Sequence, residues 1–142
     1  MTNPDITSDL RRLMQEHPQL CDYGIVALGF LDAVSFAKSR ADLIASAELV
    51  GRVLHLLESA PRTITPTIGS YGLKHTVERF LRTYVSNGAL ISAALLLQIP
   101  VKPMPPNAQL GIGRRWLRLL KSGGMTIPGF AHDQKGSCDD QE

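Results

Sequence analysis

The stretch from Ala89 to Leu97 constrains this chain more than any other, because Ser92 is its only polar residue. It is far shorter than the roughly 18 apolar residues that a membrane span needs. A helix that is hydrophobic on all sides belongs in the interior of a protein. The rest of the chain must therefore supply the elements that enclose this segment. With 142 residues, the chain has the length of a single domain.

Apolar residues recur at helical spacing on both sides of this segment. Leu10, Leu13 and Met14 form one such face, and the repeat from Leu43 to Leu57 forms the clearest one. Pro61 ends that helix, and Ser86 or Asn87 caps the apolar one. The predicted helices cover about residues 7–16, 23–38, 40–60, 70–82 and 88–98, with a sixth over 107–121 or, after a short extended piece, over 114–121.

The segments between these helices show no alternating strand pattern. Residues 62–69 are β-branched and predict an extended connector, while four prolines within residues 100–106 predict a stiff loop. The sequence therefore predicts an all-α or nearly all-α fold, a single compact bundle of five to six helices over residues 1–124. Residues 125–142 have no periodicity and turn acidic, so we expect a flexible tail there.

Composition excludes several classes of protein. Hydrophobic residues make up 44 % and charged residues 20 %, which is typical of a globular domain. Two cysteines, Cys21 and Cys138, cannot form a disulfide framework or a CxxC metal site. The start of the chain lacks the layout of a signal peptide. We expect a cytoplasmic protein with no membrane contact, no metal and no cofactor.

Charge is distributed unevenly along the chain. Residues 62–122 hold nine Lys or Arg residues against the single acidic residue Glu78, a net charge of +8, whereas residues 1–61 and 123–142 each carry −3. A basic block of this kind is typical of proteins that contact polyanions or acidic protein faces, although it is also found on solvated surfaces. The candidate basic surface comprises Arg79, Arg82, Arg114, Arg115, Arg118 and Lys121.

The segment 114–121 is the strongest part of this surface. Arg114, Arg118 and Lys121 are spaced i, i+4 and i+7, so they share one helix face. Such a stripe suits contacts to nucleic-acid phosphates, and it equally suits an acidic groove of a protein. The helix pair 70–82 and 88–98 resembles a helix-turn-helix, but its second helix is too apolar to read base edges.

A second candidate site is the polar cluster of the helix from residue 70. Its members are Tyr71, Lys74, His75, Glu78 and Asn87. His75 and Glu78 lie three residues apart, which places both on one helix face, and such a pair can serve as general acid and base inside a cleft. The same spacing joins His55 to Glu58, but further carboxylates for a metal centre are lacking.

One stretch of about 40 residues carries a distinctive motif set. It begins as Ser-Tyr-x-Leu-Lys-His-x-x-Glu, continues as Tyr-x-Ser-Asn-Gly-x-x-Ile and ends with Asn-Ala; the matching positions are Ser70, Tyr71, Leu73, Lys74, His75, Glu78, Tyr84, Ser86, Asn87, Gly88, Ile91, Asn107 and Ala108. This set resembles short uncharacterised proteins of phages, plasmids and other mobile elements. The resemblance implies a mobile-element origin and assigns no activity. Gln98 stands where a glycine is expected after the apolar helix.

These observations lead to one functional hypothesis and two alternatives. The first is a small, non-enzymatic accessory protein of a mobile element that binds nucleic acid or a nucleoprotein through its basic surface. The second is an inhibitor or adaptor that binds an acidic face of a host protein. The third is a small helical enzyme centred on His75 and Glu78. The sequence leaves the oligomeric state open.

Overall fold

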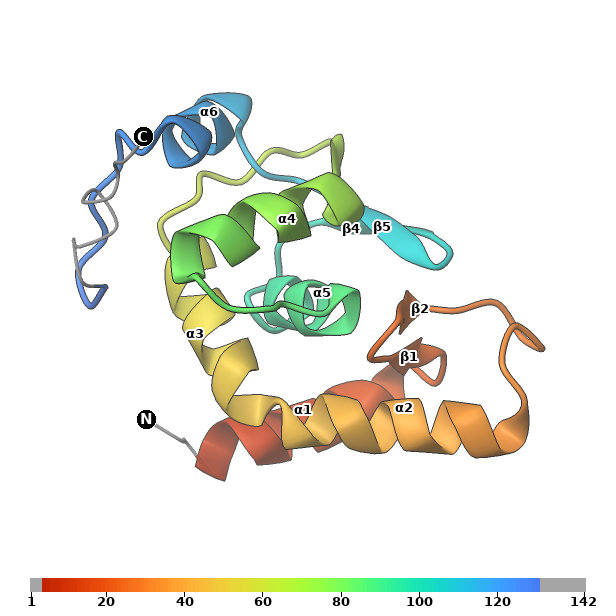
Figure 1. The fold of residues 1–142 in the computed structure, drawn as a ribbon. Coiled ribbons are helices and arrows are strands. Elements are labelled where there is room, and N and C mark those ends of the chain that lie inside the picture. The colour runs from red at the N-terminus through yellow and green to blue at the C-terminus, as the bar shows by residue number, and fades with distance from the viewer. Residues whose placement is uncertain (1–3, 131–142) are drawn as a thin grey trace.

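The computed structural model describes residues 4–130. Helix α5 lies in the middle of the molecule, with α4 and α6 on one side and α1 and α2 on the other (Figure 1). Short strands lie beside the N-terminal end of α5. The helices are α1 (Pro4–Glu16), α2 (Ala33–Ala45), α3 (Ala47–Leu57), α4 (Ser70–Leu81), α5 (Asn87–Leu96) and α6 (Arg114–Ser122).

The strands form two small antiparallel sheets. In the first, β1 (Leu20–Cys21) pairs with β2 (Gly24–Ile25). In the second, β5 (Asn107–Leu110) lies between β3 (Ile68–Gly69) and β4 (Val101–Met104). The fold is therefore a mixture of helices and sheets, and the prediction of an all-α bundle is wrong.

The central position predicted for the apolar helix is where α5 lies. Leu90, Ile91 and Ala94 are fully buried, whereas Leu95 keeps some exposure. Ser86 caps the helix by accepting a hydrogen bond from the amide of Ala89. Because α5 is enclosed by other elements, it cannot enter a nucleic-acid groove.

The end of α5 explains the position at which glycine was expected. Gln98 adopts φ +61°, in the left-handed region that glycine occupies most easily. The amide of Gln98 bonds the Leu95 carbonyl and that of Ile99 bonds the Ala94 carbonyl, the hydrogen-bond pattern of a Schellman motif. The chain turns back at this point into β4.

The second predicted helix is wrong over its first half. Residues 20–25 form a hairpin with a two-residue turn at Asp22 and Tyr23, and α2 begins only at Ala33, capped by Asp32. Gly24 has φ +126°, and a Cβ there would collide with the Pro106 carbonyl and the Asn87 side chain. The apolar spacing of residues 26–34 resembles a helix, but the close approach of the two turns requires a glycine with positive φ at position 24.

Other boundaries also differ from the predicted ones. The break predicted between residues 38 and 40 is absent, because Ser39 lies inside α2, and the helix predicted over 40–60 is divided at Ser46 into the end of α2 and α3. The proline-rich residues 101–104, predicted as a loop, form β4. Residues 107–110 follow the second of the two versions predicted for this region, an extended piece before the helix, and Gly123 ends that helix at φ +77°.

Residues 125–130, placed in the tail by the sequence, pack on the helices. Ile127 is buried, and the Phe130 ring lies against the rings of His55 and Phe80. Nε2 of His55 lies 2.6 Å from the carbonyl oxygen of Pro128. The remainder of the predicted tail, residues 131–142, lies outside the described residues.

Candidate functional site

Helix α4 brings four of the predicted polar residues together. Tyr71, Lys74, His75 and Glu78 follow one another at i, i+3, i+4 and i+7, so their side chains leave the same side of the helix. The edge of one ring of the Tyr71–His75 pair meets the face of the other, with 4.7 Å between the centroids. Other residues of α4, including Leu73 and Val77, are buried and fix the orientation of the helix, which packs against α5.

Glu78 joins these side chains through three hydrogen bonds. Its Oε2 accepts from Nζ of Lys74 at 2.9 Å and from the Val85 amide at 3.1 Å, and its Oε1 lies 3.1 Å from Nδ1 of His75. Burial is the largest single influence and opposes the charge of the carboxylate, but the hydrogen bonds from Lys74, Val85 and His75 and the charge of Lys74 together outweigh it, so the pKa of Glu78 lies below its usual value. The carboxylate is therefore ionised at neutral pH.

Lys74 is buried, which is unusual for a lysine. It pairs with Glu78 at i, i+4 and is only 8 % exposed. Its ammonium group lies 4.8 Å from the centroid of the Tyr84 ring. A buried ammonium group needs such compensation, and here Glu78 and Tyr84 provide it.

His75 lies at the edge of this cluster and is about half exposed. Within the described residues, only its Nδ1 has a hydrogen-bond partner, the carboxylate of Glu78. A carboxylate that holds Nδ1 orients the other ring nitrogen and supports acid–base chemistry there. His75 and Glu78, with Arg79, Thr83 and Tyr84, line a shallow hollow of about 360 Å³.

Asn87, the fifth member of the predicted cluster, lies at the start of α5 and bonds elsewhere. Its Nδ2 donates to the carbonyl oxygens of Tyr23 and Pro106 and to Oδ1 of Asn107, at 3.0–3.1 Å. One amide group thus ties the β1–β2 turn and the β4–β5 turn to α5. Gly88 makes the approach possible, because a Cβ there would collide with the Cys21 carbonyl.

These turns enclose a cavity of about 460 Å³, which we call the tyrosine cavity. It is bounded by the β1–β2 turn, α2, α4, the segment after α4, the start of α5 and the β4–β5 turn. Its lining residues are Asp22, Tyr23, Ser39, Asp42, Tyr71, Lys74, Tyr84, Asn87, Pro106 and Asn107. Sequence reasoning singled out Tyr71, Lys74 and Asn87 as a site and missed the others, although Tyr84 and Asn107 belong to the motif set.

The residues of the basic surface occupy two helices in contact, α4 and α6. Trp116 and Leu120 are buried, and Nε1 of Trp116 donates to Oγ of Ser59 at 3.0 Å. The basic side chains of α6 face outward: Arg114, Arg115, Arg118 and Lys121 are all exposed and make no hydrogen bond or ion pair within the described residues. Arg79 is exposed likewise, and Arg82 lies at the end of α4.

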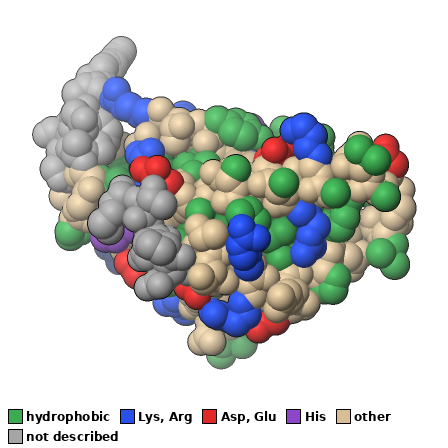
Figure 2. All heavy atoms as spheres, turned by 90° about the horizontal axis from the view of Figure 1, so that it is seen from below, with side chains coloured by type: hydrophobic (Ala, Val, Ile, Leu, Met, Phe, Trp, Pro, Cys, Tyr) green, Lys and Arg blue, Asp and Glu red, His purple; other side chains and the backbone are tan. Residues whose placement is uncertain are grey.

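On the opposite side of the molecule, formed by α1 and α2, basic side chains are accompanied by acidic ones, unlike on α6. Figure 2 shows Lys and Arg side chains on this face among hydrophobic surface, with Asp and Glu side chains nearby. Two of its basic residues are paired, Arg12 with Asp9 and Lys38 with Asp42.

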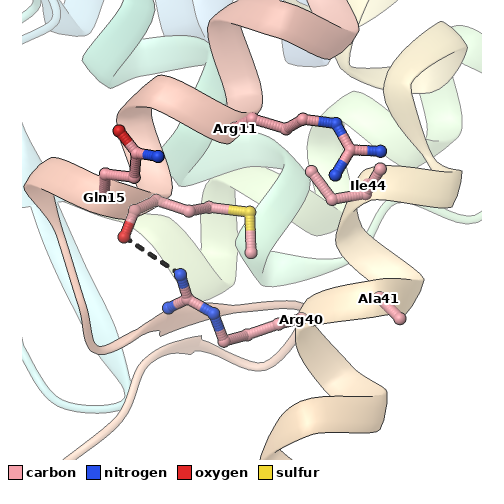
Figure 3. Close-up of a pocket in the computed structure, with 6 residues that line it drawn as sticks. Arg11, Gln15, Arg40, Ala41 and Ile44 are labelled. Atoms are coloured by element: carbon pink, nitrogen blue, oxygen red, sulfur yellow. Dashed lines mark hydrogen bonds between the residues drawn. The ribbon is translucent and has the colours of Figure 1, made fainter.

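A hollow of about 370 Å³ between these helices is lined by Arg11, Met14, Gln15, Arg40, Ala41 and Ile44 (Figure 3). The Arg40 guanidinium donates to the carbonyl oxygens of Met14, Pro18 and Leu20. Because these carbonyls lie at and just after the end of α1, Arg40 holds that helix end in place.

Residues 4–130 lack two features. No group of three or more His, Cys, Asp or Glu side chains there is arranged to hold a metal ion. No helix in that range is long and apolar enough to cross a membrane. His55 and Glu58 do meet, with Nδ1 and Oε1 3.3 Å apart, as a pair on the surface of α3.

No protein-family model, curated protein or solved structure matches this chain.

Proposed function

We propose that this chain binds the phosphate backbone of nucleic acid, free or within a nucleoprotein, through α6. Arg114, Arg115, Arg118 and Lys121 are the primary contacts. Arg79 and Arg82, on the helix against which α6 packs, extend the surface. We further propose that the chain is an accessory protein of a mobile element. This part of the proposal is supported only by the motif resemblance of residues 70–108.

The observation that carries the proposal is the position of Arg114 and Arg115 at the start of α6. The N-terminus of a helix carries partial positive charge, so acidic residues are favoured in its first turn and cations are disfavoured. This helix has two arginines and no acidic residue there, and its N-cap Gly113 supplies no side-chain acceptor. A bound anion relieves both problems, because it accepts hydrogen bonds from the free amides and neutralises the guanidinium groups.

A polyanion satisfies this arrangement better than a single anion. Arg118 and Lys121 continue along the helix with no partner among the described residues, so successive phosphates of one backbone can meet successive side chains. Arginine also binds phosphate through two parallel hydrogen bonds. An acidic face of a host protein would use the same side chains, and the experiment below distinguishes the two partners.

The test is the salt dependence of binding to short single-stranded DNA, duplex DNA and RNA. Wild-type protein should bind at ~50 mM salt, and log affinity should fall linearly with log salt. The variant Arg114→Ala/Arg118→Ala/Lys121→Ala should lower the magnitude of that slope by roughly two to three units for every sequence alike. Its melting temperature should stay near that of wild type, because unpaired surface charges contribute little to stability.

The matched control removes the same charge from the other side of the molecule. Arg11, Arg12 and Lys38 are exposed on α1 and α2, so Arg11→Ala/Arg12→Ala/Lys38→Ala changes net charge equally. This variant should keep the wild-type slope. Equal losses in the two triple variants would contradict a role for α6, since net charge alone would then explain binding. Absence of any binding at ~50 mM salt would reject nucleic acid and favour the acidic protein partner.

A further inference from the structure

All three tyrosines of the chain line the tyrosine cavity. Tyr23, Tyr71 and Tyr84 are 57 %, 59 % and 67 % exposed, although large aromatic side chains in proteins are usually well buried. They come from the β1–β2 turn, α4 and the segment after α4, so the fold gathers them from three separate places. The Tyr84 ring meets the Lys74 ammonium group and the Tyr71 ring packs against His75, so a group that enters the cavity meets the remaining exposed surface of the three rings.

The lining of the cavity also carries two carboxylates. Asp22 lies in the β1–β2 turn and Asp42 on α2; burial, the largest cause, raises the pKa of Asp22, and the charge of Asp42 adds a smaller rise. Ser86 and Lys38 act in the opposite direction. Lys38 pairs with Asp42 at 3.1 Å, but both side chains are exposed, and such pairs contribute little.

Two buried acceptor atoms in the lining lack donors. Asn87 is 8 % exposed, and its Oδ1 accepts no hydrogen bond from the described residues although its Nδ2 makes three. Oδ1 of Asp22 is likewise buried and unpartnered among those residues. Lys74, the basic residue of the lining, has its charge compensated by Glu78 at 2.9 Å. The lining residues thus carry two carboxylates, Asp22 and Asp42, against one ammonium group whose charge Glu78 already compensates.

We propose that the tyrosine cavity binds an alkylguanidinium or alkylammonium group, held between the carboxylates of Asp22 and Asp42 and the rings of Tyr23, Tyr71 and Tyr84. Aromatic faces attract organic cations, and carboxylates form charge-assisted hydrogen bonds with their N–H groups. None of the lining residues comes from α6, so this site is separate from the proposed phosphate-binding surface. A nucleotide fits the walls less well, because its phosphate would face Asp22 and Asp42.

The experiment uses the full chain labelled on its tyrosine rings and observed by NMR. Because the chain has three tyrosines, every signal reports on this cavity. Two probes represent two sources of the same group: agmatine for a free amine, and acetyl-arginine methylamide for an arginine side chain of a partner protein. Saturable chemical-shift changes of the tyrosine signals with either probe support the proposal. The probe that binds more tightly shows whether the natural ligand is a free amine or an arginine side chain. The neutral isostere acetyl-citrulline methylamide should produce no saturable shift.

Two pairs of variants separate the cation site from a general effect on the fold. Asp22→Asn should weaken the better probe by about tenfold or more, the equivalent of one charge-assisted hydrogen bond, while Glu16→Gln, an exposed carboxylate of α1 outside the cavity, should leave affinity unchanged. Tyr84→Leu should weaken binding, and Phe30→Leu, an exposed ring that does not line the cavity, should not.

Three results would overturn the proposal. The first is no shift with either cation, and the second is equal binding of the citrulline isostere or of adenosine monophosphate. The third is wild-type affinity in a folded Asp22→Asn variant. Neither the success nor the failure of this test bears on the salt-dependent binding of α6, because that measurement uses different residues.

Discussion

Nδ2 of Asn87 donates a hydrogen bond to Oδ1 of Asn107 across 3.0 Å, joining two members of the motif set that lie 20 residues apart in the chain. The same Nδ2 also reaches the carbonyl oxygens of Tyr23 and Pro106. Asn87 therefore holds two turns against the start of α5, and these turns form one wall of the tyrosine cavity. The motif residues of α4 form the adjoining wall.

Removing the Asn87 side chain should destabilise the protein. Asn87→Ala removes the donor of the Tyr23 carbonyl and of Asn107 Oδ1, while the Pro106 carbonyl keeps the Ile25 amide, so we expect a loss of about 1–3 kcal/mol. Asn107→Ala removes just one partner of Asn87 and should cost less. Urea unfolding followed by circular dichroism measures both. Equal stabilities of the Asn87→Ala variant and wild type would contradict the role of Asn87 in holding the turns.

Replacing Gln98 should stabilise the protein, which is unusual for a single substitution. Gln98 is exposed and has φ +61°, a conformation that costs a residue with a Cβ about 1 kcal/mol. Gln98→Gly should therefore raise the free energy of unfolding by about that amount. Gln98→Ala keeps a Cβ and should give no such gain. If Gln98→Gly and Gln98→Ala were equally stable, the positive φ of Gln98 would not explain any gain in stability.

Asp22 should make stability depend on pH in the direction opposite to most acidic residues. Its pKa is raised in the folded chain, chiefly by burial, so the unfolded chain loses this proton at lower pH than the folded chain does. The folded state therefore loses stability as the pH rises from about 3.8 through the raised pKa. Asp22→Asn removes this penalty, so the variant should melt higher than wild type at pH 7.

The comparison at low pH provides the control for that prediction. Below the ordinary Asp pKa of 3.8, the carboxyl group of wild type is protonated in both states, and the gain from Asp22→Asn should disappear. Thermal melts of both proteins at pH 3 and pH 7 are sufficient. A gain of the same size at the two pH values would show that charge at Asp22 is not involved.

Leu90 and Leu95 should respond differently to truncation, although both lie on α5. Leu90 is fully buried, whereas Leu95 is partly exposed where the helix approaches its end. Leu90→Ala should cost ~2–5 kcal/mol, the usual range for a buried leucine. Leu95→Ala should cost clearly less, since its surroundings include solvent. The reverse order, measured by chemical denaturation, would mean that the centre of the core lies elsewhere.

The helical part of the fold and part of the site follow from local sequence patterns. The apolar stretch had to be central, Ser86 caps α5 as expected, and the i, i+4 spacing brings Lys74 to Glu78. These features depend on residues close together in the chain, where helix geometry alone sets the distances. The same spacing places Tyr71, Lys74, His75 and Glu78 on one side of α4.

The tertiary structure alone decided the sheets and the cavity. The hairpin at residues 20–25 and strand β4 are too short for a sequence pattern, and they exist because Gly24, Gly88 and the Asn87 side chain let three segments approach closely. Contacts between residues distant in the chain bury Lys74. They also bring Asp22 and Asp42 into the same cavity lining as the three tyrosines. Periodicity carries information about which side of a helix is buried, but it does not specify which turns meet at that helix's end.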